Sequence, residues 1–333
     1  MRYPFGLVLD SARHLMARKL RGDHKCTVML SLEPLGGGCC GSQNGSMLSV
    51  DQCIAALDEC RAPIVAICGR EPLEYPEIAT LAREILQRRR HVFLCTDGTM
   101  IRRCLHLITP YNHFFWNVRL DGTAEVHERR SGRRGGFPGA VDGIQAAKNA
   151  GFLVVVTSSV YPDTHVDDLA ALYDSLHKMQ VDGYMLTPHY PSEKLCRDGS
   201  ARFREKMHER FREISARLSS YNVMTSPIYL EYLRGERELH CSAWGNPVYG
   251  PQGWSEPCSK QNVRYVKGYN ELLDNAVWEN YGRGLNLRCE NCLGHEGYET
   301  AALLGVNPKA GDLWKLLVWQ LSGGLGERRN GKS

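Results

Sequence analysis

Short, nearly continuous apolar runs alternate with amphipathic helical stretches from about residue 26 to residue 218, and this alternation restricts the fold more than any other feature. Apolar runs without a regular polar face are typical of parallel strands that are buried on both faces. The predicted strands are Thr27–Pro34, Pro63–Gly69, His91–Gly98, Phe114–Asp121, Leu153–Val160 and Gly183–Tyr190. The predicted helices are Ser49–Cys60, Tyr75–Arg89, Met100–Leu107, Pro138–Ala150, Val166–Met179 and Ala201–Leu218.

Six successive strand–helix units predict an α/β fold with a parallel sheet, either doubly wound or a partial barrel. In both architectures the chemistry gathers at the carboxyl ends of the strands. Within one predicted strand, the period of two puts Asn117, Arg119 and Asp121 on the same face, and such a polar face indicates a site. The other polar or small residues at strand ends are Glu33, Gly69, Arg70, Glu71, Cys95, Thr96, Asp97, Thr157, Ser159, Thr187 and His189.

The regular alternation stops after about residue 220, where aromatic residues, glycine, proline and cysteine become more frequent. We therefore predict an N-terminal helix over residues 1–24, a barrel domain over 25–220 and a cysteine-containing C-terminal domain over 221–333.

Four cysteines of this C-terminal part follow the spacing Cys241-x16-Cys258-x30-Cys289-x2-Cys292. A C-x2-C pair presents two thiolates from one tight turn, and two further thiolates complete a four-sulfur set. Such a set is typical of Zn²⁺ or an iron–sulfur cluster, and the spacing does not distinguish between them.

Composition and charge exclude several other classes of protein. The net charge of +4 is too small to predict nucleic-acid binding, and the basic clusters (Arg88–Arg90, Arg129-Arg130 and Arg133-Arg134) lack interleaved aromatic residues, so we interpret them as solvated helix ends or loops. No apolar run is long enough to span a bilayer, and the first residues do not resemble a signal peptide. We therefore expect a cytoplasmic protein with reduced cysteines.

The first 21 residues form a basic amphipathic pattern. Apolar residues recur at helical spacing, whereas Arg13, Arg18, Lys19 and Arg21 occupy the other side. Such a helix packs against the floor of a barrel, which we favour, or lies on the inner membrane surface as a peripheral contact.

The whole chain resembles the hopanoid-biosynthesis radical SAM proteins of the HpnH type, the adenosylhopane-forming enzymes. The matching stretches are Leu32–Leu35, Leu48–Val50, Gly69-x-Glu71-Pro72-Leu73, Leu94–Thr96, Leu120–Gly122, Val181–Gly183, His240-Cys241, Trp244–Pro247, Gly253-Trp254, Pro257-Cys258, Tyr281-Gly282 and Cys289-x2-Cys292 with His295 and Gly297–Glu299.

This resemblance implies a partial (β/α)6 barrel of the radical SAM type that binds S-adenosylmethionine (SAM) at the strand ends. It places the SAM amino group against Gly69 and Glu71, and the adenosine near Thr157, Ser159 and Thr187. We also assign Arg70, Thr96 and Asn117 to cofactor binding.

The chain departs from the family in two motifs. The family has C-x3-C-x2-C directly after the position of Leu35, whereas the stretch from Gly36 to Met47 contains only the adjacent Cys39 and Cys40. We therefore do not expect the conventional SAM-cleaving [4Fe–4S] cluster. Arg70 also stands where the family has a second glycine, and its guanidinium suits the SAM carboxylate.

Three functions remain open. The first is a SAM-dependent enzyme that uses the sulfonium in polar chemistry on an organic or lipid acceptor, with Asp97, Arg119, Asp121 and His189 as catalytic groups. The second is radical transfer of a 5′-deoxyadenosyl group to an alkene. The third is a non-catalytic partner protein. The oligomeric state is not readable from the sequence.

Overall fold

The computed structural model describes residues 2–23, 25–36, 46–190, 200–261, 264–305 and 308–322. Its strands are β1 (Met29–Leu32), β2 (Ile64–Ile67), β3 (His91–Thr96), β4 (Phe114–Arg119), β5 (Leu153–Val160), β6 (Gly183–Pro188), β7 (Val248–Gly250), β8 (Gly253–Glu256) and β9 (Arg264–Val266). The first six coincide with the six predicted strands, each shortened or unchanged at its ends.

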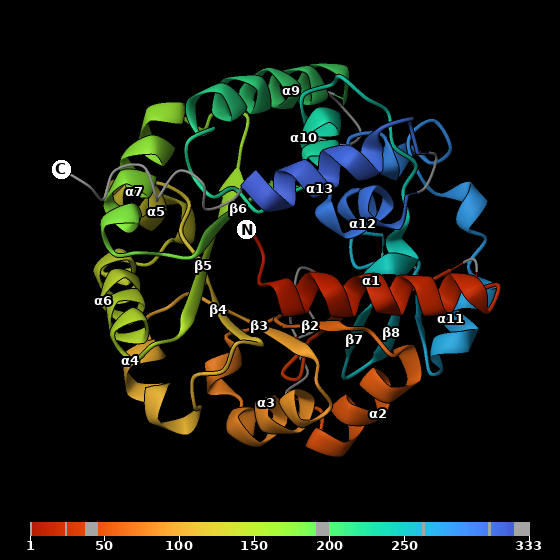
Figure 1. Ribbon diagram of the computed structural model, residues 1–333, viewed down its shortest axis with the longest axis horizontal. Coiled ribbons are helices and arrows are strands. Elements are labelled where there is room, and N and C mark those ends of the chain that lie inside the picture. Colours follow the sequence, from red (N-terminus) through yellow and green to blue (C-terminus); the bar gives the residue numbers. More distant parts are fainter. Residues whose placement is uncertain are drawn as a thin grey trace.

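The sheet order β6-β5-β4-β3-β2-β1-β7-β8-β9 decides between the two predicted architectures. Strands β1 to β6 are parallel and follow one another without a reversal. Right-handed crossovers then place all the connecting helices on one face, so the sheet curves into a barrel rather than a doubly wound layer. Because β6 lies at one edge and β1 continues into β7, the barrel is open (Figure 1). The predicted α/β barrel class is confirmed.

The described helices are α1 (Phe5–Leu20), α2 (Val50–Cys60), α3 (Ile78–Gln87), α4 (Ile101–Cys104), α5 (Ala124–Ser131), α6 (Gly136–Asn149), α7 (Val166–Lys178), α9 (Ser200–Arg217), α10 (Pro227–Leu233), α11 (Tyr269–Asn275), α12 (His295–Leu304) and α13 (Asp312–Ser322). Helices α2, α3, α6 and α7 lie on the outer side of the sheet (Figure 1). Short 3₁₀ helices lie at Pro72–Glu74, Leu105–Leu107, Ala243–Gly245, Trp278–Asn280 and Leu287–Cys289. No helix in the described part of the chain combines the length and apolar character that crossing a membrane requires.

The two faces of the strands differ in burial. The helix-facing side chains of β3, β4 and β5, such as Leu94, Trp116 and Val156, are completely buried. On the inner face, Phe93, Phe115 and Val155 form a small apolar cluster at the floor of the barrel. The inner residues nearer the carboxyl ends of β4, β5 and β6 are partly exposed, so the interior opens at that end.

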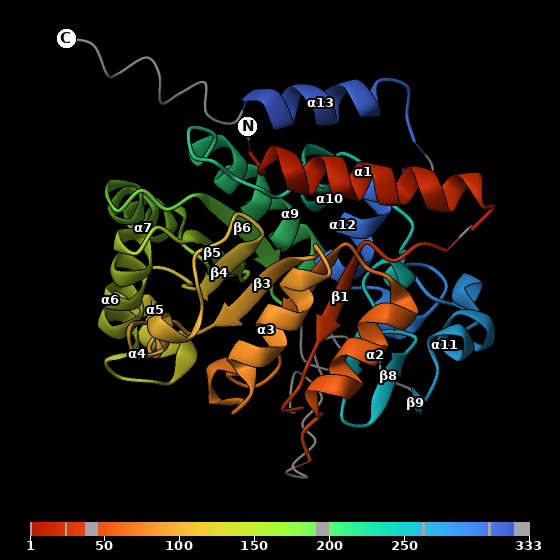
Figure 2. The ribbon, with the colours of Figure 1, turned by 60° about the horizontal axis from the view of Figure 1, so that its bottom comes forward.

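Helix α1 lies across the floor of the barrel, at the amino ends of the strands (Figure 2). Leu7 packs into the apolar cluster of the floor. The Asp10 carboxylate contacts His91 Nε2 at 3.2 Å, and His14 Nε2 lies 2.9 Å from the Thr27 carbonyl oxygen. These contacts correspond to the packing arrangement favoured for the N-terminal helix.

The segment after residue 220 joins the barrel sheet at both edges. Val223 forms a parallel bridge with Tyr184 of β6, and β7 pairs in parallel with β1. Strands β8 and β9 then extend the sheet in antiparallel fashion. Strands from the predicted barrel domain and the predicted C-terminal domain therefore share one sheet, and the division at residue 220 stays a prediction.

Candidate functional site

Glu71 connects the loops that follow β2 and β3. Its Oε1 accepts a hydrogen bond from the Leu73 backbone at 3.1 Å, and its Oε2 accepts one from the Asp97 backbone at 3.0 Å. Burial raises the pKa of this carboxyl, although the bonds from Asp97, Leu73 and the Thr96 hydroxyl oppose that shift. A carboxylate offers about four acceptor positions, so one remains for a donor on a ligand.

Gly69 brings the backbone of this loop close to the end of β1. Its φ of +93° is a conformation that favours glycine, and an added Cβ would lie 3.1 Å from the Glu33 side chain. The Arg70 N–H donates to the Gly36 carbonyl oxygen at 3.3 Å. The Arg70 side chain is exposed and lies 3.8 Å from Glu74, so it points along the rim rather than into the interior.

The inner faces of β3, β4 and β5 are joined by a chain of hydrogen bonds. The Thr157 hydroxyl donates to Asn117 Oδ1 at 2.6 Å, and Asn117 Nδ2 donates to Cys95 Sγ at 3.4 Å. Thr187 on β6 is the register partner of Ser159 on β5. The structure therefore places Asn117, Thr157, Ser159 and Thr187 on adjoining strands.

Above these residues, Arg119 and Asp121 form an ion pair. Arg119 Nη2 lies 2.9 Å from Asp121 Oδ2, and Asp121 Oδ1 accepts a 2.8 Å hydrogen bond from the Ser159 backbone. Arg119 also donates to the Tyr161 hydroxyl at 3.2 Å, and the Tyr161 ring stacks on His189 with 4.2 Å between centroids. Burial lowers the pKa of His189, and the nearby Arg119, Lys260 and Arg130 lower it further.

Asp97 lies apart from this group. Its Oδ1 accepts from the Thr99 backbone at 3.0 Å and from the Thr99 hydroxyl at 2.7 Å, while Oδ2 pairs with Arg133. Thr96 is buried, and its hydroxyl accepts from the Gly98 backbone at 3.0 Å. Both residues thus support the loop after β3. Cys39 and Cys40 lie outside the described residues.

Three residues around the barrel opening, Tyr161, Arg130 and Arg133, were not predicted from the sequence to belong to the site. Tyr161 directly follows β5, and the two-residue period from Ser159 could have indicated it. Arg130 stacks over Tyr161, with its guanidinium carbon 4.0 Å from the ring centroid, and pairs with Asp163. The sequence predicted Arg130 and Arg133 to be solvated residues at helix ends or in loops. Arg130 does end a helix and Arg133 does follow it. Their side chains, however, pair with the acidic residues Asp163 and Asp97 around the barrel opening.

The four C-terminal cysteines line one pocket, which we call the cysteine pocket. It contains about 410 Å³ of space, its open mouth included, and is lined by Cys241, Ala243, Pro257, Cys258, Lys260, Gln261, Trp278, Tyr281, Gly282, Cys289, Cys292 and Tyr298. The four cysteines come from three separate segments, with Cys289 and Cys292 on the same one, so only the folded chain brings these thiols together. Gly297 of α12 adjoins this pocket, and an added Cβ there would lie 2.3 Å from Cys241 Sγ.

The cysteine pocket has the chemistry of a four-thiolate ligand set. Burial raises the pKa of Cys241 well above its usual range, and the neighbouring Cys292, Cys258 and Cys289 raise it further. Burial likewise raises the pKa of Cys258 to about 11. Four buried thiols ionise together only around a cation, and a bound metal supplies that charge. The residues therefore fit a metal centre.

The four thiols suit either of two centres. Bonds of about 2.3 Å to one tetrahedral Zn²⁺ would bring the sulfur atoms within about 3.8 Å of one another. An iron–sulfur cluster would instead spread the thiolates over several irons. A separate set of ligand-type residues in the described part of the chain, Asp10, His91 and His113, has its ligand atoms within 4.8 Å of one another.

The cysteine pocket adjoins the barrel opening through β6. The Tyr190 hydroxyl, just after β6, donates to the Arg288 carbonyl oxygen at 3.1 Å, next to Cys289. Lys260, which lines the pocket, lies 5.6 Å from the Tyr190 ring centroid and 3.4 Å from Glu296. The two candidate sites are therefore connected by direct contacts.

Two family models match the chain: the radical SAM superfamily over residues 40–176, and a domain of unknown function, DUF3463, over residues 184–316. The chain therefore carries a radical SAM superfamily domain.

A curated relative is the Fe-coproporphyrin III synthase of Methanosarcina barkeri (strain Fusaro / DSM 804), 26% identical over 141 residues. The match covers 40% of this chain and 34% of that protein, so the chain spans about a third of the relative's length.

Among solved structures, Streptococcus suis SuiB bound to S-adenosylmethionine has a TM-score of 0.60 at 13% identity, covering 82% of this chain and 70% of that one. SuiB bound to its precursor peptide SuiA has a TM-score of 0.62 at 12% identity, covering 90% and 77%. At such low identity these similarities show the shared fold.

Proposed function

We propose that this chain, with its radical SAM superfamily domain, is an enzyme that binds SAM across the carboxyl ends of β1 to β6 and transfers a carbon group to an organic or lipid acceptor. The SAM-bound SuiB structure supports this proposal through its fold alone. In parallel α/β folds the carboxyl ends of the strands meet at one edge of the sheet, and the predicted ligand residues lie at or near these ends.

The observation that carries the proposal is the arrangement around Glu71. Its partly buried carboxylate has one acceptor position left, between two loops that its own hydrogen bonds hold in place. Next to it, Gly69 keeps the backbone free of a side chain. An ammonium group of SAM would complete the coordination of Glu71, and a charge-assisted hydrogen bond of this kind is worth about 1.5–3 kcal/mol.

We favour polar transfer, because the loop after β1 carries only Cys39 and Cys40, without the three spaced cysteines of the conventional cluster motif. When bound, SAM would supply an electrophilic carbon to an X–H group of the acceptor, with the electron pair of the broken carbon–sulfur bond left on sulfur. His189 would take the proton of X–H. Its lowered pKa keeps the imidazole neutral and able to accept that proton.

The remaining groups would orient this step. Arg119 and Tyr161 would position an acceptor beside His189, and the Asp121 carboxylate would favour the imidazolium that forms. Asn117 and Thr157 line the wall of the barrel beside the adenosine position.

A second candidate function is radical transfer of the 5′-deoxyadenosyl group to an alkene. The observation that favours it is the cysteine pocket beside the barrel opening, whose four thiols form a ligand set that suits an iron–sulfur cluster. We propose that Cys241, Cys258, Cys289 and Cys292 hold such a cluster rather than zinc. When bound, a cluster there supplies structural support and one-electron chemistry. Lys260 would offset part of its negative charge.

The test is titration calorimetry with SAM on the purified full chain. We expect binding in the micromolar range, about −7 to −8 kcal/mol. Glu71→Gln should weaken it about ten- to hundredfold, because the charge-assisted bond is lost. Glu74→Gln is the matched control, since Glu74 lies in the same turn but is half exposed. No binding to the wild-type chain would leave the non-catalytic partner as the function.

Products then separate the two chemistries. S-adenosylhomocysteine or methylthioadenosine formed in air supports polar transfer. 5′-Deoxyadenosine or an adenosylated product that appears only with a reductant contradicts it and supports the radical route.

A further inference from the structure

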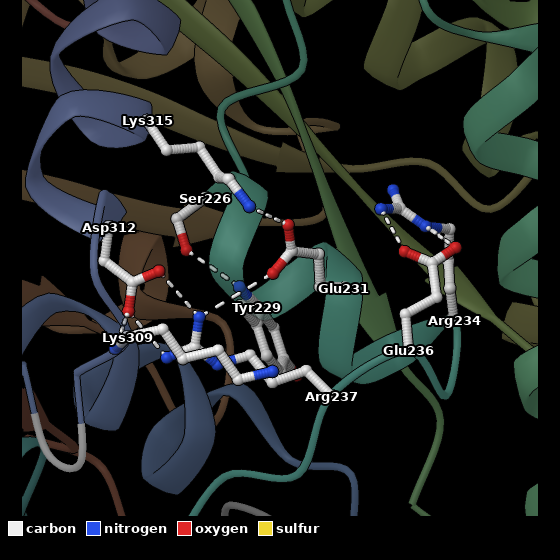
Figure 3. A network of polar contacts seen from close by, with 9 residues as sticks. All are labelled: Ser226, Tyr229, Glu231, Arg234, Glu236, Arg237, Lys309, Asp312 and Lys315. Carbon is white, nitrogen blue, oxygen red and sulfur yellow. Dashed lines mark hydrogen bonds and ion pairs between the residues drawn. The ribbon is translucent and has the colours of Figure 1, made fainter.

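Helix α13 is attached to the protein by its polar residues. Its two buried residues are Asp312 and Gln320. Arg237, which follows α10, holds Asp312 through two hydrogen bonds of 2.8 and 2.7 Å, and Lys315 pairs with Glu231 of α10 (Figure 3). Beside these polar side chains, Leu316 is partly buried and packs against the core, so polar residues share with it the inner face that a surface helix normally fills with apolar residues.

The other end of α13 is held in the same way. Gln320 Nε2 donates to the Tyr3 carbonyl oxygen at 2.7 Å, and the Tyr3 N–H donates to Gln320 Oε1 at 3.2 Å. The Arg2 N–H donates to the Gln320 carbonyl oxygen at 3.0 Å. The helix is thus fixed at both ends against α10 and the segment before α1.

Most apolar residues of α13 face outward, Leu316 and Trp319 being partly buried. Leu313, Trp314, Leu317, Val318 and Leu321 are all exposed, with Trp314 at 71% and Leu317 at 55%. Their spacing of one and three residues puts them on a single face of the helix. A contiguous apolar face of this kind marks an interaction surface.

Helix α1 extends this surface. The two helices lie close together on the same side of the molecule in both views (Figures 1 and 2), and Tyr3 contacts Trp319 with 5.9 Å between ring centroids. Phe5, Met16 and Leu20 of α1 are exposed as well. We call these eight outward side chains of α1 and α13 the apolar face.

The unpaired exposed charges around the apolar face are mainly basic. Among the described residues of α1, α13 and their flanks, Arg13, Lys19, Arg21 and Lys309 are exposed, whereas Lys315 pairs with Glu231 and Asp23 with Arg18. The acidic residues of the two helices are engaged, Asp10 with His91 and Asp312 with Arg237. In the sequence, residues 323–333 add three basic residues and one acidic residue.

We infer that the apolar face is a membrane-binding surface that docks on anionic lipid. Leucine, phenylalanine and tryptophan side chains insert at the level of the lipid headgroups, while lysine and arginine at the rim bind their phosphates. The face lies at the amino ends of the strands, and β1 runs away from it toward the opposite side (Figure 2). Attachment there leaves the carboxyl-end opening accessible to SAM from the aqueous side. The inference is independent of the chemistry proposed above.

Vesicle co-sedimentation of the full chain tests this surface. We expect binding to phosphatidylcholine vesicles that contain phosphatidylglycerol, and weaker binding when phosphatidylglycerol is omitted or salt is added. Leu317→Glu should weaken binding about ten- to hundredfold, because it puts a charge where an apolar side chain would insert into the membrane. Leu317 is exposed and both residues are good helix formers, so the fold should be unchanged.

The matched control is Val277→Glu, since Val277 is also 55% exposed but lies outside α1 and α13. This variant should bind vesicles like the wild-type chain. Replacing both Arg13 and Lys19 with glutamine should weaken binding to the anionic vesicles about thirtyfold, from about 1 kcal/mol for each basic residue.

Three outcomes would overturn the inference. The first is wild-type chain that stays in the supernatant with anionic vesicles. The second is Leu317→Glu protein that binds them as well as the wild type does. The third is a dimer, measured without lipid by analytical ultracentrifugation, that Leu317→Glu dissociates. That result would assign the apolar face to a second copy of the chain.

Discussion

The barrel opening and the cysteine pocket are neighbours, yet the polar groups of the opening are paired with one another, whereas the thiols of the pocket oppose one another's ionisation. At the opening, each acidic group has its partner: Glu71 binds backbone N–H groups, and Asp121 binds Arg119 and the Ser159 backbone. In the pocket, Cys241 and Cys258 are surrounded by other thiols, and burial raises the pKa of both.

This difference indicates two kinds of ligand. Polar groups that form hydrogen bonds and ion pairs with one another keep their positions without a ligand, so they suit a cofactor that binds and leaves. Buried thiols that oppose one another's ionisation become thiolates together only around a cation, so they suit a metal centre that stays bound. We therefore expect substitutions in the cysteine pocket to affect stability, and those at the barrel opening to affect mainly SAM binding.

The largest effect should come from Cys292→Ser. Losing one thiolate should release the metal and lower the free energy of unfolding by about 5 kcal/mol or more, because metal binding and folding are coupled. Iron, sulfide and zinc analysis together with chemical denaturation measures both quantities. The control is Cys104→Ser, another buried cysteine outside the pocket, which should keep its metal. Unchanged metal content in Cys292→Ser would contradict the expectation that the cysteine pocket, unlike the barrel opening, holds a permanently bound metal.

Glu299 on α12 gives the next effect, in the pH dependence of stability. Burial raises its pKa from 4.5 to about 7. The protonated form of Glu299 is thus favoured in the folded chain. Its contribution to the free energy of unfolding is therefore fully present below pH 4.5 and is lost as the pH rises through about 7. Glu299→Gln stays neutral, so at pH 8 it should be more stable than wild type by about 3 kcal/mol, with little difference at pH 4.5.

Denaturation at several pH values, with the exposed Glu279→Gln as control, measures this difference. A constant difference between Glu299→Gln and wild type across the pH range would contradict the expectation.

At the barrel opening, Asp121→Asn should have a smaller effect on stability. The substitution weakens a charge-assisted contact of a buried carboxylate with Arg119, which is worth about 1.5–3 kcal/mol. Asp163→Asn is the matched control, because Asp163 also pairs with an arginine but is 70% exposed, so its loss should cost at most about 1 kcal/mol. Equal losses in the two variants would show that burial does not strengthen the Asp121 pair.

Arg70→Ala should have the smallest effect. Its side chain is exposed and its partner is the half-exposed Glu74, so the free energy of unfolding should change by less than about 0.5 kcal/mol. SAM affinity, measured by calorimetry, should fall less than in Glu71→Gln. A larger loss of affinity in Arg70→Ala would support the predicted contact between Arg70 and the SAM carboxylate.

The positions of the strands and their terminal residues could be predicted from the sequence because they depend on local pattern. The apolar runs place β1 to β6, and the polar residue after each run falls at one edge of a parallel sheet. The two-residue period also put Asn117 and Arg119 on the inner face. The four cysteines were recognised by type and spacing, and the structure lines one pocket with them.

Contacts between distant segments could not be read from such local patterns. The pairing of β7 with β1, the partners of Arg130 and Arg133, and the position of Tyr161 beside His189 depend on how the segments are brought together in space. The choice between a barrel and a doubly wound sheet likewise depends on strand order, which is a non-local property.

Helix α13 shows this limit most clearly. Its sequence determines an amphipathic helix, but not which face is turned inward, because both a core and a lipid surface accept leucine and tryptophan. Only the tertiary structure decides that question. Arg237, Glu231 and the segment before α1 bind its polar side chains, and most of its apolar side chains are therefore left facing outward.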